Sequence, residues 1–179
     1  MPPAIDGSSV HLVHRFFDVL SAPPLRANEV AAIGAWLSEA EDRLFFEQPR
    51  PDQRHGYEAA LSIVAAGIRD TRVIGAALLH DIGKRHTGLG VVARSATSVL
   101  IAIKAPLPSR MAKYRDHGRI AAEELAAIGS ADLVVEFARH HHHSRPAGMD
   151  LAAWAALTIA DAPPKAKVLV RRPITWQSR

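Results

Sequence analysis

The stretch Ala77-Leu78-Leu79-His80-Asp81-Ile82-Gly83-Lys84 decides how the rest of the chain is organised. Apolar residues run directly into His80 and Asp81, which indicates a buried helix that ends on an imidazole and a carboxylate. Buried polar groups need partners, because an unpaired one costs free energy. A divalent metal ion would satisfy both side chains, so this stretch predicts a metal site at a helix end.

The composition favours one soluble, mostly helical domain with a full core. The chain has 179 residues, of which 48% are hydrophobic, and it contains no cysteine. Disulfides, thiolate metal sites and a cysteine nucleophile are therefore excluded. The N-terminus lacks the pattern of a secretory signal, and the most apolar window, 89–108, is too short and too charged to span a bilayer. We expect a cytoplasmic protein with no membrane partner and no specific nucleic-acid motif.

The positive charge is concentrated directly after the His-Asp pair. The formal net charge is +4, and the segment from Lys84 to Arg119 holds a single acid, Asp116. Its eight basic residues are Lys84, Arg85, Arg94, Lys104, Arg110, Lys113, Arg115 and Arg119. Such a segment would attract an anionic substrate. The alternative is an ordinary solvated helix face.

The spacing of apolar residues predicts an all-α fold, a single helical bundle with an N-terminal helical extension. Residues 1–50 are expected to form a helical cover, with helices over 10–20, after Asn28, and after the capping box Ser38–Glu41. Residues 51–165 are expected to form the metal-binding domain, and 166–179 a basic, loosely packed tail. The domain's helices are predicted over 53–69 (capped by Asp52), 71–83 (stopped by Gly83), 88–105, 116–128, 131–142 and 150–162.

Two helical hairpins would bring the polar residues together. His55 begins one helix, and His80 and Asp81 end the next, so a short turn leaves all three at one end of the hairpin. The second hairpin repeats this arrangement, with one histidine at its start and two at its end: His117, His140 and His141. The last helix, about 17 Å long, can cross back and deliver Asp161 to the same pole.

This donor set suits one or two divalent transition metals. Imidazole and carboxylate ligands favour Mn, Fe, Co, Ni or Zn, with Mg also possible. Six such groups are more ligands than one tetrahedral site with an open position can use, but they suit two metals that share a carboxylate. A single inward histidine would ordinarily be a core residue; the prediction depends on the whole set.

The pattern resembles the HD superfamily of metal-dependent phosphohydrolases. The family order H…HD…H…H…D is matched by His55, His80-Asp81, His117, His140 or His141, and Asp161. The resemblance implies that His55, His80, Asp81 and Asp161 hold a first metal. It implies that His117 and one or both of His140 and His141 hold a second, with Asp81 bridging.

The resemblance further implies hydrolysis of a phosphate ester or anhydride, with a nucleotide or a similar small phosphorylated metabolite as the expected substrate. Asp81 and Lys84 are the expected catalytic residues, and Arg54, Lys84 and Arg85 the expected substrate contacts. The contexts His117-Gly118 and Ala160-Asp161 look most like the branch that splits diadenosine tetraphosphate, but 35 residues, 82–116, separate Asp81 from His117, unlike that branch's compact form. Two alternatives stay open: a di-iron oxygenase on the same fold, and a non-catalytic nucleotide-binding regulatory module.

Overall fold

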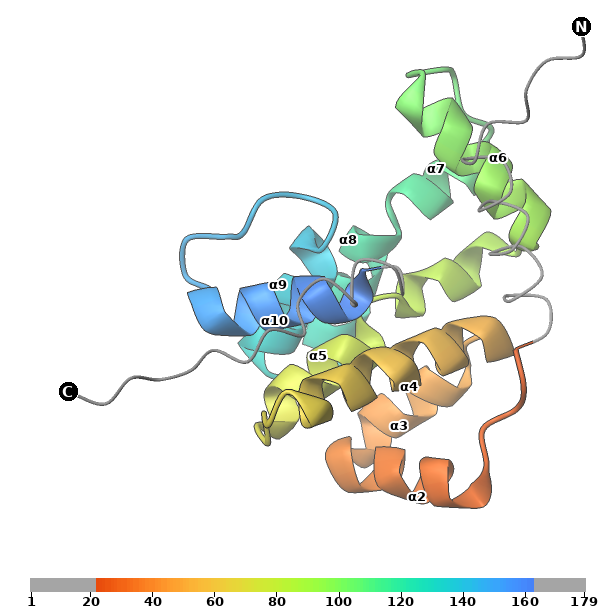
Figure 1. The fold of residues 1–179 in the computed structure, drawn as a ribbon. Helices are drawn as coiled ribbons and strands as arrows, with labels where there is room; N and C mark the ends of the chain where they lie inside the picture. The colour runs from red at the N-terminus through yellow and green to blue at the C-terminus, as the bar shows by residue number, and fades with distance from the viewer. Residues whose placement is uncertain (1–21, 163–179) are drawn as a thin grey trace, which may run out of the picture.

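The computed structural model describes residues 22–162, apart from the side chains at positions 91, 92, 95, 98 and 102. Within this part of the chain there are nine α-helices and one 3-10 helix, and no strand, which confirms the all-α prediction (Figure 1). The elements are α2 (Ala27–Trp36), α3 (Glu39–Phe46), α4 (Arg50–Ala65), α5 (Thr71–Leu79), η1 (Ile82–Thr87), α6 (Val91–Ala102), α7 (Ser109–Arg115), α8 (His117–Ala127), α9 (Asp132–His140) and α10 (Leu151–Asp161). None of these helices is long and apolar enough to cross a membrane.

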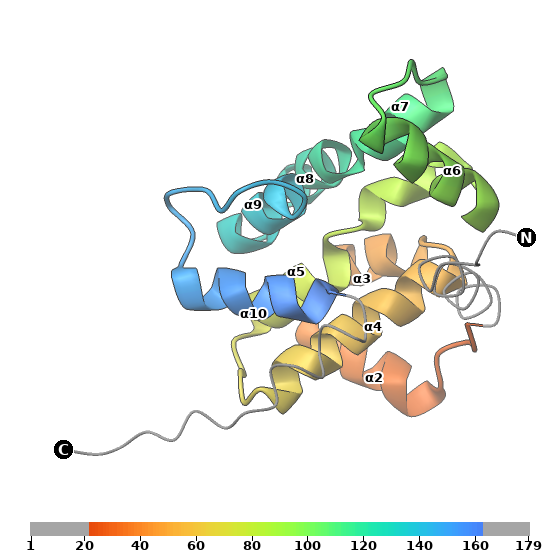
Figure 2. The ribbon, with the colours of Figure 1, turned by 45° about the horizontal axis from the view of Figure 1, so that its top comes forward.

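Helix α5 is the centre of the packing. Every residue from Val73 to Leu79 is buried, because the whole circumference of this helix is apolar. Helix α4 packs against α5, α9 packs against its other side, and α8 packs on α9, so two hairpins lie together. Helix α10 runs across α4 and α5 and closes the bundle (Figures 1 and 2). Its last residue, Asp161, lies 3.0 Å from His55 of α4, so the last helix returns to the pole where the hairpins meet.

The N-terminal helices share the same core. Ile33 of α2 and Phe45 of α3 are fully buried, and both helices contact α5. The capping box Ser38–Glu41 is present, with the Ser38 hydroxyl accepting from the Glu41 amide at 3.3 Å. Helix α2 begins after Arg26, so the predicted cap at Asn28 is wrong. The predicted helix over 10–20 and the predicted tail over 166–179 lie outside the described residues.

Several predicted boundaries differ from the structure for local reasons. Helix α4 begins at Arg50 because Pro51 fits the first turn of a helix, and Asp52 therefore lies inside the helix and not at its cap. Helix α5 ends at Leu79, and the chain continues through Gly83 as the 3-10 helix η1. Gly83 is therefore not a helix stop.

The connection between η1 and α8 contains two helices and not one. The segment between the predicted helices over 88–105 and 116–128 forms α7, which packs on η1, while α6 packs on α7. These two helices lie at one end of the molecule, beyond η1 (Figures 1 and 2). The buried Asp52 carboxylate accepts hydrogen bonds from Arg94 of α6 at 2.6 and 2.8 Å, which joins the connection to α4.

Candidate metal centre

The 3-10 helix η1, which follows α5 directly, touches the start of α8 backbone to backbone. His80 is the C-terminal cap of α5, and Asp81 is the N-terminal cap of η1. A Cβ atom added at Gly83 would lie 2.1 Å from the His117 carbonyl oxygen, so only glycine allows this approach. The contact sets Asp81 beside His117, and it thereby joins the polar ends of the two hairpins.

The first group of donors consists of His55, His80 and Asp161, from α4, α5 and α10. The His55 Nε2 atom lies 3.0 Å from Asp161 Oδ1, and the His80 Nε2 atom lies 3.1 Å from the same oxygen. His80 is buried, whereas the His55 side chain is 39% exposed. One side of this group is therefore open to solvent.

The second group consists of Asp81, His117, His141 and His142. Asp81 Oδ1 lies 3.1 Å from His117 Nε2 and 3.5 Å from His141 Nε2. The other carboxylate oxygen, Oδ2, lies 3.4 Å from His80 Nε2 in the first group. Asp81 is thus the residue that connects the two groups.

Three of the histidines are oriented in the same way. The Nδ1 atoms of His80, His117 and His141 each donate to the carbonyl three residues earlier, at 3.0, 2.5 and 2.8 Å. These bonds fix Nδ1 as a donor and turn Nε2 toward the carboxylates. A hydrogen bond on one ring nitrogen is the usual way of preparing the other for metal ligation.

The charges of the cluster depend on one another. Burial alone would lower the pKa of His80, but the carboxylates of Asp81 and Asp161 outweigh burial and raise it to about 10. Burial would raise the pKa of Asp81, yet nearby Lys84 and His80 hold it well below its ordinary value. The carboxylate is therefore charged at neutral pH. Its buried Oδ1 atom faces the Nε2 atoms of His117 and His141, but these rings carry their proton on Nδ1 when neutral, so the oxygen has no donor and a cation fits as its missing partner.

The structure brings together six of the predicted ligand residues but not His140. Those six are His55, His80, Asp81, His117, His141 and Asp161. The inward stripe of α9 runs from Val134 to His141, seven residues later, and at 100° per residue His140 lies about 120° from Val134. His140 Nε2 lies instead 3.6 Å from Glu136 Oε2.

His142 joins the second group although the sequence pattern did not indicate it. It follows α9 in a turn, where the periodicity of the helix no longer predicts direction. Its ring centroid lies 4.0 Å from that of His141 and 5.0 Å from that of His117. His142 is exposed on its outer side; desolvation of the part that faces the cluster and the neighbouring imidazoles lower the pKa of His142, so it is neutral near pH 7.

The three predicted substrate-binding cations have different surroundings. Lys84 Nζ lies 2.5 Å from Asp81 Oδ2. Arg54 donates to both carboxylate oxygens of Glu29, each at 3.0 Å. Arg85 donates to both oxygens of Glu124, at 2.8 and 3.0 Å. Of these three cations, Lys84 is therefore the one that contacts a candidate metal ligand.

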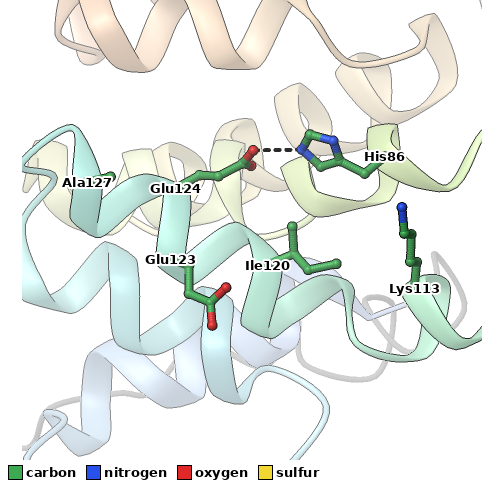
Figure 3. Close-up of a pocket in the computed structure, with 6 residues that line it drawn as sticks. All are labelled: His86, Lys113, Ile120, Glu123, Glu124 and Ala127. Carbon is green, nitrogen blue, oxygen red and sulfur yellow. Dashed lines mark hydrogen bonds and ion pairs between the residues drawn. The ribbon is translucent and has the colours of Figure 1, made fainter.

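A hollow of about 420 Å³ lies on a separate face, between η1, α7 and α8 (Figure 3). His86 binds Glu124 at 2.6 Å on its wall, with Ile120 and Lys113 nearby. No residue of the two donor groups lines this hollow. The pair His86–Glu124, together with Arg85, holds η1 against α8.

Comparison with known protein families agrees with this geometry. The model of the HD domain matches residues 28–171, which is most of the chain. The chain belongs to the HD domain family. No curated protein and no solved structure matches it. This HD domain belongs to a superfamily of metal-dependent phosphohydrolases whose members bind divalent metals, and its His/Asp cluster is where such a metal would bind.

We expect the HD domain to release protons when it binds a divalent metal near neutral pH. His80 carries an extra proton below its pKa of about 10, and a ligating imidazole must lose it. Metal affinity should therefore fall as the pH falls. The pKa of His80 in the folded state is higher than the unfolded value of about 6.5. Protonated His80 therefore contributes its full stabilisation to the metal-free fold below about pH 6.5, and this contribution is lost as the pH rises through about 10.

Calorimetric titration of the metal-free protein with Mn²⁺ in two buffers of different ionisation enthalpy measures the released protons. His140→Ala is the control, since His140 lies outside both donor groups. The same heat in both buffers would mean that His80 does not ligate or is already neutral.

Proposed function

We propose that this HD domain hydrolyses a phosphate ester or anhydride of a small phosphorylated metabolite, with a nucleotide as the expected substrate class. One observation supports the proposal most strongly. Asp81 of the second donor group also borders the first, with Oδ2 on the side of His80 and Oδ1 on the side of His117 and His141. A carboxylate between two sets of imidazoles suits a pair of divalent ions that act on one phosphoryl group.

The residues would divide between two ions. His55, His80, Asp81 and Asp161 would hold one, and Asp81, His117, His141 and His142 the other. Ions bound there generate a nucleophile from water near neutral pH and neutralise charge on phosphoryl oxygens. The Nδ1 bonds of His80, His117 and His141 keep the ligating Nε2 atoms in position.

Lys84 is the residue that we assign to the substrate phosphate. Burial opposes its charge, but Asp81 outweighs burial and raises the pKa of Lys84, so the ammonium group stays charged. Its side chain is only 16% exposed, so water competes little with the ion pair that holds the ammonium group beside Asp81. A preorganised cation of this kind stabilises negative charge that develops on a phosphoryl oxygen.

Arg54 and Arg85 fit a structural role better than contact with substrate. Their guanidinium groups already form two-pronged pairs with Glu29 and Glu124, and their side chains are 14% and 10% exposed. Such paired cations have little capacity left for a phosphate. We therefore propose that Arg54 joins α4 to α2, and that Arg85 joins η1 to α8.

The test is a screen of the metal-loaded full chain against phosphomonoesters, phosphodiesters and dinucleoside polyphosphates, with phosphate or nucleotide product as the readout. Separate samples are loaded with Mn²⁺, Fe²⁺, Co²⁺, Ni²⁺, Zn²⁺ and Mg²⁺, and oxygen consumption is recorded for the iron sample. Release of product from at least one class is expected. Consumption of oxygen without phosphate release would support an oxygenase instead, and binding without turnover would support a regulatory module.

We expect His117→Ala to lower the metal content from two ions per chain to one. His117 belongs only to the second group, while the first retains His55, His80 and Asp161, with Asp81 still beside His80. Elemental analysis after equilibrium with excess Mn²⁺ gives the stoichiometry. His140→Ala should keep the wild-type value. If His117→Ala also keeps it, His117 is not a ligand, and a single-metal enzyme becomes the better interpretation.

A further inference from the structure

Tyr114 lies at the edge of the candidate metal centre, on the side of Lys84. It is in the last turn of α7, three residues before His117. Its carbonyl accepts the hydrogen bond from His117 Nδ1, and its ring centroid lies 5.5 Å from that of the imidazole, tilted by 35°. The same ring centroid lies 6.0 Å from Lys84 Nζ. Tyr114 thus lies against both His117, a candidate metal ligand, and Lys84, the candidate phosphate contact.

The aromatic side chains around the cluster differ in their access to solvent. Phe137 also contacts the imidazoles of His80 and His141, but it is 1% exposed and belongs to the core. Trp154 packs on Phe137, with ring centroids 5.6 Å apart. Tyr114 remains partly exposed. Among the described residues that contact the cluster imidazoles through an aromatic ring, Tyr114 therefore offers a surface that a ligand can reach.

The surroundings of Tyr114 also suit an anionic ligand. The connection that carries it has no aspartate or glutamate from Ile82 to Arg115, and it contains Lys84. A ligand whose phosphate lies at Lys84 meets no carboxylate of this connection as it extends over Tyr114. Packing of α7 on η1 holds the ring and the ammonium group in a fixed relation.

We infer that the Tyr114 ring is a stacking platform for the aromatic base of the substrate, and that it determines the specificity of the protein for nucleotides. The inference rests on the proposed function, because it takes the phosphate to lie beside Lys84. An aromatic ring stacks on any base, so Tyr114 would select nucleotides over sugar phosphates without distinguishing one base from another. The ring would thus contact the base of the substrate and not the phosphoryl group that reacts.

The experiment compares two ligands that differ only by the base, AMP and ribose 5-phosphate. Their affinities for the Mn²⁺-loaded full chain are measured by calorimetry, and released phosphate is assayed in the same samples. Tyr114→Ala should weaken AMP binding about tenfold to a hundredfold, the range expected for the loss of one stacked base, and leave ribose 5-phosphate unchanged. Tyr114→Phe keeps the ring and should bind AMP as the wild type does. Met111→Ala, one turn earlier on α7, is the control for damage to that helix.

Each outcome has one interpretation. Equal weakening of both ligands in Tyr114→Ala would mean that the ring supports Lys84 or His117, and would overturn base recognition. Unchanged AMP binding would overturn it as well, as would a wild type that binds AMP no better than ribose 5-phosphate. If the protein hydrolyses sugar phosphates in that last case, only this inference fails. If it hydrolyses no phosphate compound at all, the proposed function fails.

Discussion

Asp81→Asn should reduce phosphate release by about a thousandfold or more while the helical circular dichroism signal stays largely intact. The amide has the shape of the carboxylate but no negative charge, and one of its two oxygens becomes a nitrogen that cannot ligate. Both donor groups lose the carboxylate that lies between them, since His80 and His117 lie 3.4 and 3.1 Å from the two oxygens of Asp81. The nucleophile and the charge neutralisation that the ions supply are lost together.

Asp70→Asn is the matched control. It makes the same chemical change at the other end of α5, where Asp70 caps the helix by accepting from the Arg72 amide at 2.9 Å. Asparagine caps helices about as well as aspartate, so activity and stability should stay near the wild type. His80→Ala provides an independent test of the same pair and should also abolish activity. Wild-type turnover in Asp81→Asn would refute the assignment, and unfolding of both site variants would indicate a structural metal.

The periodicity of the helices was sufficient to predict most of the candidate site. His80, His117 and Asp161 lie at helix ends and His55 lies in the second turn of α4, and hairpin geometry alone directs these positions to one pole. The sequence left His140 and His141 as alternatives; the structure places His141 in the second group and His140 outside it, because one residue along a helix turns the side chain by about 100°. Whether the six clustered residues ligate a metal stays a prediction.

The remaining features depend on contacts that one sequence does not reveal. Glu124 pairs with Arg85 from 39 positions away, and nothing local to either residue indicates the partner. The packing of α7 on η1 brings Tyr114 next to Lys84. The sequence of α7 did not predict this packing, because its basic residues leave no clear apolar stripe. His142 reaches the cluster through a turn. These are tertiary effects, and they override local pattern.

Gly83→Ala should destabilise the fold by about 3 kcal/mol or more, the upper part of the range for forced overpacking. The added Cβ would lie 2.1 Å from the His117 carbonyl oxygen, 2.9 Å from its carbon and 3.0 Å from the Ala121 amide nitrogen. All three are backbone atoms, so no side-chain rotation relieves the clash. For a domain of this size the midpoint of thermal unfolding should fall by about 6–12 °C.

Gly34→Ala is the control for the intrinsic effect of the substitution. Gly34 lies inside α2, and a Cβ there meets nothing within 4 Å. Alanine should therefore stabilise α2 by up to about 1 kcal/mol, since glycine is the poorer helix former. Thermal and urea unfolding of the two variants should move in opposite directions. A Gly83→Ala variant with the wild-type midpoint would show that η1 and α8 are not in backbone contact. If the midpoint falls as expected, the metal content of the variant becomes informative, because moving η1 away from α8 separates Asp81 from His117 and should remove the second ion first.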